Sequence, residues 1–367
     1  ASNNTDSKLY WQAGAFLFDA SNRQSLDFTI FKILQQVETK STAAFAQANY
    51  SFTDRTRATA GLRFTNDRKS EDGQNLIGNV VRGSVEDSKS SWDSWTYRIG
   101  LERDVLAASM LYASVSTGFK AGGVSLSQGP AASFDPEELT AYQVGFKAKL
   151  LDNRLSINTE LYYYDYSNYQ AAYSSLDPDF GGSIRIISNA GGATIKGGEV
   201  ESSFKITPAD LLTASVSYIH GRYGEYVTPD GIGGINDFTG SEINAPTWQL
   251  SGSYRRYFSL GNYGELSPSL SVAYRSGTYL DNRYYGPLSS AGVPGTRVAP
   301  WTWQGGITKL DAALGWSHPS EQYRVTAYAN NLTNKVSATS ISRQSNGTLT
   351  GYVESPRTYG VSFDVKF

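Results

Sequence analysis

Apolar and polar residues alternate along most of this chain, and the alternation predicts β-strands rather than helices. The pattern is clearest in the last ten residues, where apolar side chains fall on one face of a strand and small or charged side chains on the other. The apolar five are Tyr359, Val361, Phe363, Val365 and Phe367. A soluble strand with one wet face alternates in the same way. An aromatic residue that ends such a strand is typical of the closing strand of a bacterial outer-membrane barrel.

About fourteen segments alternate in this way, most of them longer than the usual strand of about 5–6 residues. They lie near residues 9–20, 38–52, 55–68, 91–104, 107–120, 137–151, 154–170, 184–206, 211–226, 246–260, 264–280, 307–318, 322–338 and 352–367. A strand needs about 9–11 residues to cross a bilayer, so these segments are long enough to do so.

The two faces of the predicted strands differ consistently. In residues 142–150 and 248–254, each apolar or small residue is followed by a polar, charged or small one. In water the apolar face would cover a second protein layer, whereas in a bilayer it would contact lipid while the polar face lines a lumen. The charged residues predicted to face inward are Arg98, Glu102, Lys147, Lys149, Glu160, Arg255, Arg275, Lys309, Asp311, Arg324 and Asp364.

Short turns and long connections alternate between the predicted strands. The short turns lie near 51–56, 103–107, 150–154, 207–210, 259–265 and 318–322. The long connections, which we expect to be loops, lie near 21–37, 69–90, 121–136, 171–183, 227–245, 281–306 and 339–351. This asymmetry is typical of an outer-membrane barrel, which has tight periplasmic turns and long extracellular loops. A soluble β-sandwich, the alternative, has no reason to place every long loop at one end.

Composition narrows the class of protein further. No stretch approaches the roughly 18 consecutive apolar residues of a membrane helix, and the mean hydropathy is -0.38. The 13% aromatic residues and 36 glycines suit an all-β chain with aromatic side chains at the membrane interfaces. The absence of cysteine excludes disulfides and thiolate chemistry. A net charge of -2 without a basic stripe argues against a nucleic-acid partner.

Several stretches resemble the β-barrel domain of TonB-dependent outer-membrane receptors. The most specific are 330–335 (NNLTNK), the Pro-Arg-Thr at 356–358 and the terminal Phe367. Further similar stretches are 60–64, 118–123, 134–137, 142–147, 161–166, 189–191 and 196–201. No single stretch is specific, and their order and spacing over about residues 60–367 carry the resemblance.

The resemblance implies an all-β fold, a transmembrane antiparallel β-barrel that occupies residues 1–367 as one domain. The family's barrel has about twenty-two strands and is filled by a plug, which carries the segment that contacts TonB. We recognise neither plug nor TonB-contacting segment in the sequence. The fourteen segments match the last fourteen strands of the family barrel, so we expect the C-terminal part of a larger receptor. Because membranes do not tolerate an open sheet edge, a closed fourteen-stranded channel is the alternative.

The resemblance also implies a function. It predicts energy-dependent uptake of a scarce nutrient across the bacterial outer membrane, most often a ferric siderophore. The expected partners are the TonB complex (through the plug), the barrel-assembly machinery, outer-membrane lipid and lipopolysaccharide, and a small ligand such as a ferric chelate. We expect no enzymatic activity, no cofactor and no metal site. A passive diffusion channel and a soluble β-sandwich binding module are the alternative functions.

The long connection at 281–306 is the strongest candidate for ligand binding, because aromatic faces and guanidinium groups suit anionic aromatic chelates and also sugars. The candidate residues are Tyr279, Arg283, Tyr284, Tyr285, Arg297, Trp301 and Trp303. An ordinary surface loop that contacts lipopolysaccharide would have a similar composition. The alternating apolar residues of the last strand, from Tyr359 to Phe367, are expected to act as the signal for barrel assembly.

Other noticeable residues favour structural roles. Three glycines at a strand end are expected to serve turn or bulge geometry: Gly118, Gly122 and Gly123. Four tyrosines are expected at the membrane interface or in packing: Tyr162, Tyr163, Tyr164 and Tyr166. The two histidines, His220 and His318, are predicted at opposite rims of the barrel, too far apart to share a metal ion.

Overall fold

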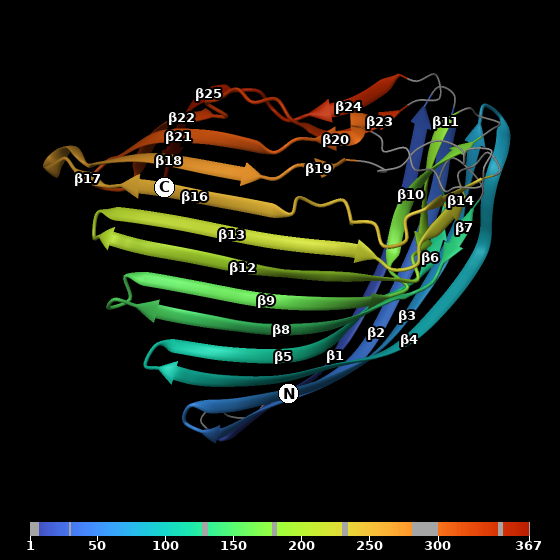
Figure 1. Ribbon diagram of the computed structural model, residues 1–367, viewed down its shortest axis with the longest axis horizontal. Helices are drawn as coiled ribbons and strands as arrows, with labels where there is room; N and C mark the ends of the chain where they lie inside the picture. Colours follow the sequence, from blue (N-terminus) through green and yellow to red (C-terminus); the bar gives the residue numbers. More distant parts are fainter. Residues whose placement is uncertain are drawn as a thin grey trace.

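The computed structural model consists of one large antiparallel β-sheet and five small two-stranded hairpins (Figure 1). It describes residues 7–28, 31–126, 131–177, 182–229, 234–280, 300–343 and 348–366. Within these ranges the helical structure is limited to two 3-10 turns, η1 (Gly261–Tyr263) and η2 (Pro300–Thr302). No helix in the described part of the chain is long and apolar enough to cross a membrane.

Fourteen strands follow one another through the large sheet in chain order, so each pairs with the strands before and after it. They are β1 (Leu9–Phe28), β2 (Phe31–Thr53), β3 (Thr56–Ile77), β4 (Val80–Leu106), β5 (Ser109–Lys120), β8 (Glu137–Leu150), β9 (Leu155–Ser167), β12 (Gly192–Thr207), β13 (Asp210–Tyr223), β16 (Trp248–Arg256), β18 (Glu265–Arg275), β21 (Ile307–Ser317), β22 (Tyr323–Asn330) and β25 (Thr358–Val365). The short β17 (Phe258–Ser259) pairs with β18. The predicted number and order of long strands are confirmed.

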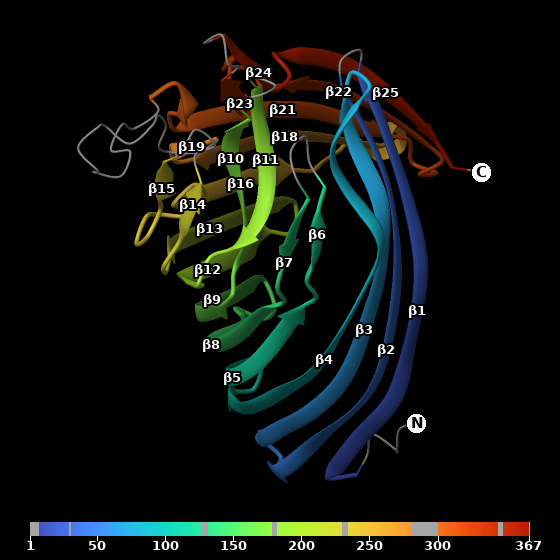
Figure 2. The ribbon, with the colours of Figure 1, turned by 90° about the vertical axis from the view of Figure 1, so that its right-hand side faces the viewer.

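The sheet is curved but not closed. Strand β1 pairs only with β2, and β25 only with β22, within the described residues. Figure 2 shows the sheet as an open trough, and Figure 1 shows the short turns gathered at one end and the hairpins at the other. The alternative of a closed fourteen-stranded barrel is therefore not what this chain forms.

The long connections lie where they were predicted, between strands of the large sheet, but every described one contains further strand rather than irregular loop alone. Residues 21–28 and 31–37 extend β1 and β2, and residues 69–77 and 80–90 extend β3 and β4. The other connections form hairpins, which are β6 (Gly123–Ser125) with β7 (Ala132–Phe134), β10 (Gln170–Asp177) with β11 (Gly182–Asn189), β14 (Val227–Pro229) with β15 (Ile235–Asp237), β19 (Thr278–Tyr279) with β20 (Trp303–Gln304), and β23 (Ala338–Arg343) with β24 (Leu349–Val353). Strands in water on both faces lack apolar alternation, so their sequences look like loops.

One predicted strand, 184–206, is in fact two. It divides at Ala190 and Gly191 into β11, which pairs with β10, and β12, which belongs to the large sheet. At the break, the amide of Gly191 donates a hydrogen bond to the carbonyl of Glu225 in the next connection (2.7 Å). The two segments share an alternating pattern, and only the change of partner separates them.

The strand register defines the two faces of the sheet, because directly opposite residues on neighbouring strands share a face. One such row runs from Arg57 in β3 to Arg275 in β18, through Glu102, Tyr112, Gly145, Glu160, Glu199, Ser217 and Gln249. All eleven charged residues predicted to face inward lie on this face. Hairpin β6–β7 lies on the concave side in Figure 2. Since Lys69 of this face donates a hydrogen bond to the carbonyl of Gly122 beside that hairpin (2.6 Å), the polar face is the concave one.

The convex face is apolar and carries two bands of aromatic residues. The band near the hairpin end contains Trp95, Tyr97, Tyr142, Tyr163, Tyr218, Trp248, Tyr274 and Tyr359, and the band near the short turns contains Tyr50, Phe52, Phe204, Tyr254, Trp316, Tyr323 and Phe363. Between the bands, large side chains such as Leu161 (63% exposed) and Ile99 (60%) have no protein layer over them. No second sheet packs on this face in the described part of the chain, so the β-sandwich alternative is wrong.

Candidate functional site

Three of the predicted ligand-binding residues meet at hairpin β19–β20. Tyr279 lies directly opposite Trp303, and their rings are 4.9 Å apart at 62°. The amide of Leu280 donates a hydrogen bond to the carbonyl of Thr302 (2.8 Å), which extends the pairing of the hairpin by one residue away from the large sheet. Trp301 lies in η2, two residues before Trp303 of β20. Trp303 remains 48% exposed, so an aromatic surface is available at the hairpin end of the sheet.

The remaining four predicted residues lie outside the described residues. They are Arg283, Tyr284, Tyr285 and Arg297. The assignment of ligand binding to the connection at 281–306 therefore stays a prediction. What the structure adds is that both flanks of this connection are aromatic and held together as paired strands.

A second assembly at the hairpin end joins β6–β7 to β10–β11 through two amide side chains. The Gln170 Nε2 donates hydrogen bonds to the carbonyls of Ala121 and Asp135 (3.0 Å each). The Asn189 Nδ2 donates to the carbonyls of Asp135 and Asn168 (3.0 and 2.8 Å), while its Oδ1 accepts from the amide of Asp135 (2.7 Å). These contacts connect residues up to 54 positions apart and hold the two hairpins as one unit.

The neighbouring hairpin β14–β15 packs onto this unit through a small hydrophobic core. That core contains Ala171, Tyr173, Ala190, Tyr226 and Phe238, with Tyr169, Ile186 and Tyr223 against it. The rings of Tyr169, Tyr223, Tyr226 and Phe238 contact in sequence at 6.0, 5.0 and 5.4 Å. Burial raises the pKa values of Tyr223 and Tyr226 to about 12. We name the three hairpins together the hairpin block.

The sequence analysis missed the hairpin block. Its core residues lie in segments that we expected to be loops or strand ends, and its links depend on single polar residues such as Gln170 and Asn189. The available signal was the recurrence of tyrosine at 169, 173, 223 and 226, at or just past the ends of two predicted strands. Aromatic residues that lie outside a bilayer need another partner to cover them.

The NNLTNK stretch forms a compact, hydrogen-bonded turn directly after β22. Asn331 is almost fully buried and has a positive φ of 51°, a conformation that asparagine tolerates better than most residues. Its Nδ2 donates to the carbonyls of Lys335 (2.9 Å) and Ser355 (3.3 Å), and its Oδ1 accepts from the amide of Lys335 (2.9 Å). The stretch therefore fixes both ends of the connection that carries β23–β24.

Glu354 anchors the same connection to the sheet. It forms ion pairs with Arg275 of β18 (2.9 Å) and with Lys309 of β21, and it accepts a hydrogen bond from the Ser337 hydroxyl (2.7 Å). Burial alone would raise the pKa of Glu354, but the bonds from Lys309 and Ser337 and the charge of Arg275 hold it below its usual value. The inward charges Arg275 and Lys309 thus serve as attachment points for a hairpin.

The four adjacent tyrosines of β9 divide between the two faces. Tyr163 faces outward in the aromatic band, as predicted, opposite Tyr142. Tyr162, Tyr164 and Tyr166 face the concave side, so of the two predicted roles, membrane interface or packing, these three have packing. The rings of Tyr162 and Tyr164 stack at 4.7 Å, so they present a half-buried aromatic surface to the lumen.

Two glycines of the 118–123 stretch, Gly122 and Gly123, allow close packing rather than a turn. None of them has a positive φ. A Cβ on Gly122 would collide with the carbonyl of Phe134 and approach Trp92 at 3.0 Å, because hairpin β6–β7 lies directly against this residue. The close approach of a neighbouring strand, and not the predicted turn or bulge, accounts for glycine at this position.

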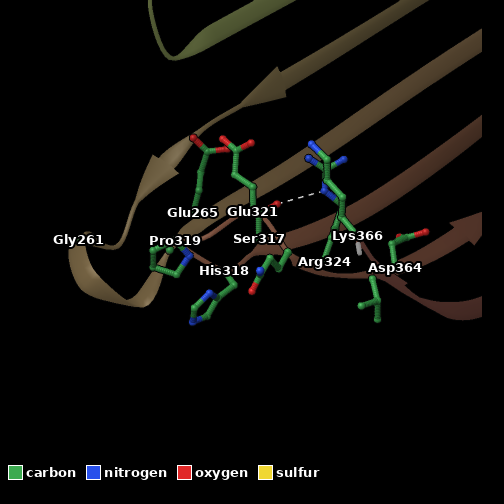
Figure 3. Close-up of a pocket in the computed structure, with 12 residues that line it drawn as sticks. Gly261, Glu265, Ser317, His318, Pro319, Glu321, Arg324, Asp364 and Lys366 are labelled. Atoms are coloured by element: carbon green, nitrogen blue, oxygen red, sulfur yellow. Dashed lines mark hydrogen bonds between the residues drawn. The ribbon is translucent and has the colours of Figure 1, made fainter.

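A polar pocket of about 660 Å³ lies at the short-turn end, between η1, the β21–β22 turn and β25 (Figure 3). Its lining carries both signs of charge, with Glu265, Glu321 and Asp364 against Arg324 and Lys366. His318 points away from Glu265 and Glu321 in Figure 3, and its Nδ1 lies 2.8 Å from the hydroxyl of Ser320 in the same turn. No group of residues suited to a metal ion occurs among the described residues, and His220 lies at the opposite end, in β13.

The large sheet has the features of the wall of a transmembrane β-barrel of the outer-membrane type. Its long strands form a meander, its concave face is polar, and its convex face is apolar with an aromatic band near each end. The model of the family described as TonB dependent receptor-like, beta-barrel, matches residues 3–332. The chain belongs to this family, whose members are bacterial outer-membrane proteins.

Individual relatives support the fold. The ferric yersiniabactin uptake receptor FyuA of Yersinia pestis superposes on the whole chain with a TM-score of 0.77 at 18% identity, and the chain covers 52% of it. The ferric-catecholate import receptor Fiu of E. coli gives 0.69 at 15% identity, with 53% covered. In sequence, the metal-pseudopaline receptor CntO of Pseudomonas aeruginosa is 29% identical over 201 residues, which are 55% of this chain and 25% of that protein. The chain thus spans about half the length of these solved receptors and a quarter of that curated relative.

Proposed function

We propose that this chain forms the C-terminal part of the barrel of a TonB-dependent receptor that imports a scarce nutrient as a metal chelate, with a ferric siderophore as the leading candidate. The observation that best supports this proposal is the aromatic surface of Tyr279 and Trp303, at the hairpin end of the sheet. Planar aromatic rings suit the aromatic or sugar-like faces of such chelates. The receptors FyuA, Fiu and CntO, to which the chain is similar, are named for ferric or metal chelates.

In this proposal, other parts of the receptor supply the plug and the remaining strands of the barrel. A plug in the lumen would receive energy from the TonB complex, and the missing strands would pair with the open edges of β1 and β25. The alternating residues Tyr359 to Val365 of β25, with Phe367 beyond the described residues, would be read by the barrel-assembly machinery. Import requires no bond to be made or broken, so the proposal includes no catalytic residue and no cofactor.

Ligand binding tests this proposal in the complete receptor purified in detergent. We expect one of three probes, a ferric catecholate, a ferric hydroxamate or ferric citrate, to quench tryptophan fluorescence at saturable concentration. The double variant Trp301→Ala/Trp303→Ala should bind that probe roughly tenfold or more weakly, since buried aromatic contacts are common binding hot spots. Trp248→Phe, in the outward aromatic band, is the matched control and should bind normally.

Two results would contradict the proposal. Unchanged affinity in the double variant would remove the β19–β20 hairpin from the site. Steady conductance of the complete receptor in planar bilayers, without TonB, would favour the passive diffusion channel instead.

A further inference from the structure

The polar pocket at the short-turn end of the sheet has no part in the proposed uptake of a chelate. It has a volume of about 660 Å³ and lies on the concave face, at the opposite end from the hairpins (Figure 3). Four neighbouring strands each contribute one residue to a row that lines it, in the order Glu265, Ser317, Arg324 and Asp364. Because the short turns of such barrels face the periplasm, the pocket is open to periplasmic solutes.

Hydrogen bonds fix the backbone around the pocket. The Nε1 of Trp316 donates to the carbonyl of Tyr263 in η1 (2.8 Å), which holds this turn against β21. The amide of Lys366 donates to the carbonyl of Gln322 (2.9 Å), which holds the end of the chain against the β21–β22 turn. Glu321 has a positive φ of 56° within that turn, a conformation that is uncommon for glutamate. The backbone therefore sets the positions of Glu321 and Lys366 before any ligand binds.

The charges in this pocket do not neutralise one another. Arg324 lies directly opposite Asp364, yet the two side chains form no ion pair within the described residues. The Arg324 Nε donates instead to the hydroxyl of Ser317 (3.1 Å). Elsewhere on the concave face, neighbouring opposite charges do join, as Arg57 does with Glu102 (3.3 Å). The two Nη groups of Arg324 therefore remain available to a further acceptor.

The pocket has an acidic side and a basic side. In Figure 3, Glu265 and Glu321 lie towards η1, whereas Arg324 and Lys366 lie towards β25. Neither glutamate forms an ion pair with any residue that the structure describes, and the same is true of Lys366. Unpaired carboxylates that share a pocket favour a bound ammonium group, and unpaired cations favour a bound carboxylate. The chemistry of the pocket thus suits a ligand that carries both groups.

The distance between the two sides indicates a short peptide rather than a single amino acid. Glu265 and Arg324 lie two strands apart in one row, so about 10 Å separates their backbones. An extended peptide advances about 3.3–3.6 Å per residue, so a chain of about three residues spans this distance. Such a peptide places its ammonium group at one side of the pocket and its carboxylate at the other.

We propose that this pocket binds a short zwitterionic peptide from the periplasm. Its ammonium group lies between Glu265 and Glu321, and its carboxylate accepts hydrogen bonds from Arg324 and Lys366. Two sources offer this chemistry, which are free peptides and the stem peptides of the cell wall. The site lies at the opposite end of the barrel from the Tyr279 and Trp303 surface, so it does not depend on the imported ligand.

Isothermal titration calorimetry of the complete receptor in detergent tests the site with three probes. Trialanine should bind, whereas N-acetyl-trialanine amide, which lacks both charges, should bind at least tenfold more weakly. A soluble muropeptide that carries a stem tetrapeptide is the third probe. If it binds more tightly than trialanine, the cell wall is the source of the ligand, and equal or weaker binding identifies free peptides.

Two variants test the two sides of the pocket separately. Glu265→Gln and Lys366→Gln should each weaken trialanine binding roughly tenfold, as expected for the loss of one charge-assisted contact. Neither replaced charge has an ion pair within the described residues, so we expect both variants to fold, and heat-modifiable gel migration verifies this. Lys149→Gln is the matched control, since Lys149 faces the lumen near the same end but outside the pocket, and it should bind normally.

Three results would overturn the proposal. Trialanine does not bind, or the blocked peptide binds as tightly as trialanine does. The third is that a folded Glu265→Gln or Lys366→Gln receptor binds trialanine as the unmodified receptor does. None of these results would affect the uptake proposal, which is tested at Trp301 and Trp303.

Discussion

At the scale of single residues, the concave face is organised by aromatic rings that lie flat across glycines of the next strand. The pairs are Tyr112 over Gly145, Tyr162 over Gly197 and Tyr328 over Gly360. Each glycine is needed because a Cβ would collide with the ring, and each ring covers backbone that glycine leaves bare. This arrangement lets Tyr112 reach across a strand and donate a hydrogen bond to Glu160 (2.6 Å).

The Tyr112 pair gives the first prediction. Gly145→Ala should destabilise the folded receptor by about 1–3 kcal/mol, the usual range for overpacking, because the new methyl displaces Tyr112 from Glu160. Urea unfolding in lipid vesicles measures the change. Gly100→Ala is the control, since its Cβ would meet nothing closer than 3.6 Å. Adding Tyr112→Ser to Gly145→Ala should recover part of the lost stability. Equal destabilisation by Gly145→Ala and Gly100→Ala would contradict this explanation.

At the scale of elements, alternation predicted the strands that cross the membrane but not those beyond it. The residues 142–150 form one strand as expected because lipid on one side and a wet lumen on the other impose strict alternation. The residues 69–90 continue β3 and β4. They were expected to be a loop because a strand with water on both faces lacks the alternating pattern. The contacts that hold the hairpins to one another and to the sheet depend on isolated side chains such as Gln170 and Glu354, which no periodicity marks.

Glu354 supplies a prediction about pH. Its folded pKa lies below the usual 4.5, so its stabilising effect is complete above that value and is lost as the pH falls through the lower folded pKa. Glu354→Gln should therefore cost about 1–3 kcal/mol at neutral pH, where two cations lose their partner. Thermal unfolding of both proteins across the acid range measures the difference, which should shrink towards zero as the pH falls. A difference that does not depend on pH would show that charge is not what anchors this hairpin.

At the scale of the whole molecule, the sequence predicted the order of fourteen strands and the correct face of the eleven charges that it assigned to the inside, because lipid constrains each crossing strand in the same way. It could not predict how the hairpins pack on one another. The proposed ligand surface at Tyr279 and Trp303 lies in a hairpin beyond the membrane strands, where lipid imposes no alternation on the sequence. The edges of β1 and β25 are open because no further strand among the described residues pairs with them.

Adjacent residues of β16 test which solvent covers the convex face. Leu250 faces outward and Ser251 faces the lumen, so the two positions share a depth and differ in face. Leu250→Arg should destabilise the receptor in a lipid bilayer by about 2–4 kcal/mol, the cost of a charge near the bilayer midplane on the lipid side of a barrel. Ser251→Arg should cost far less, since its guanidinium meets water and other polar side chains. Heat-modifiable migration and urea unfolding in lipid vesicles report both, and equal tolerance at the two positions would mean that hydrocarbon does not cover this face.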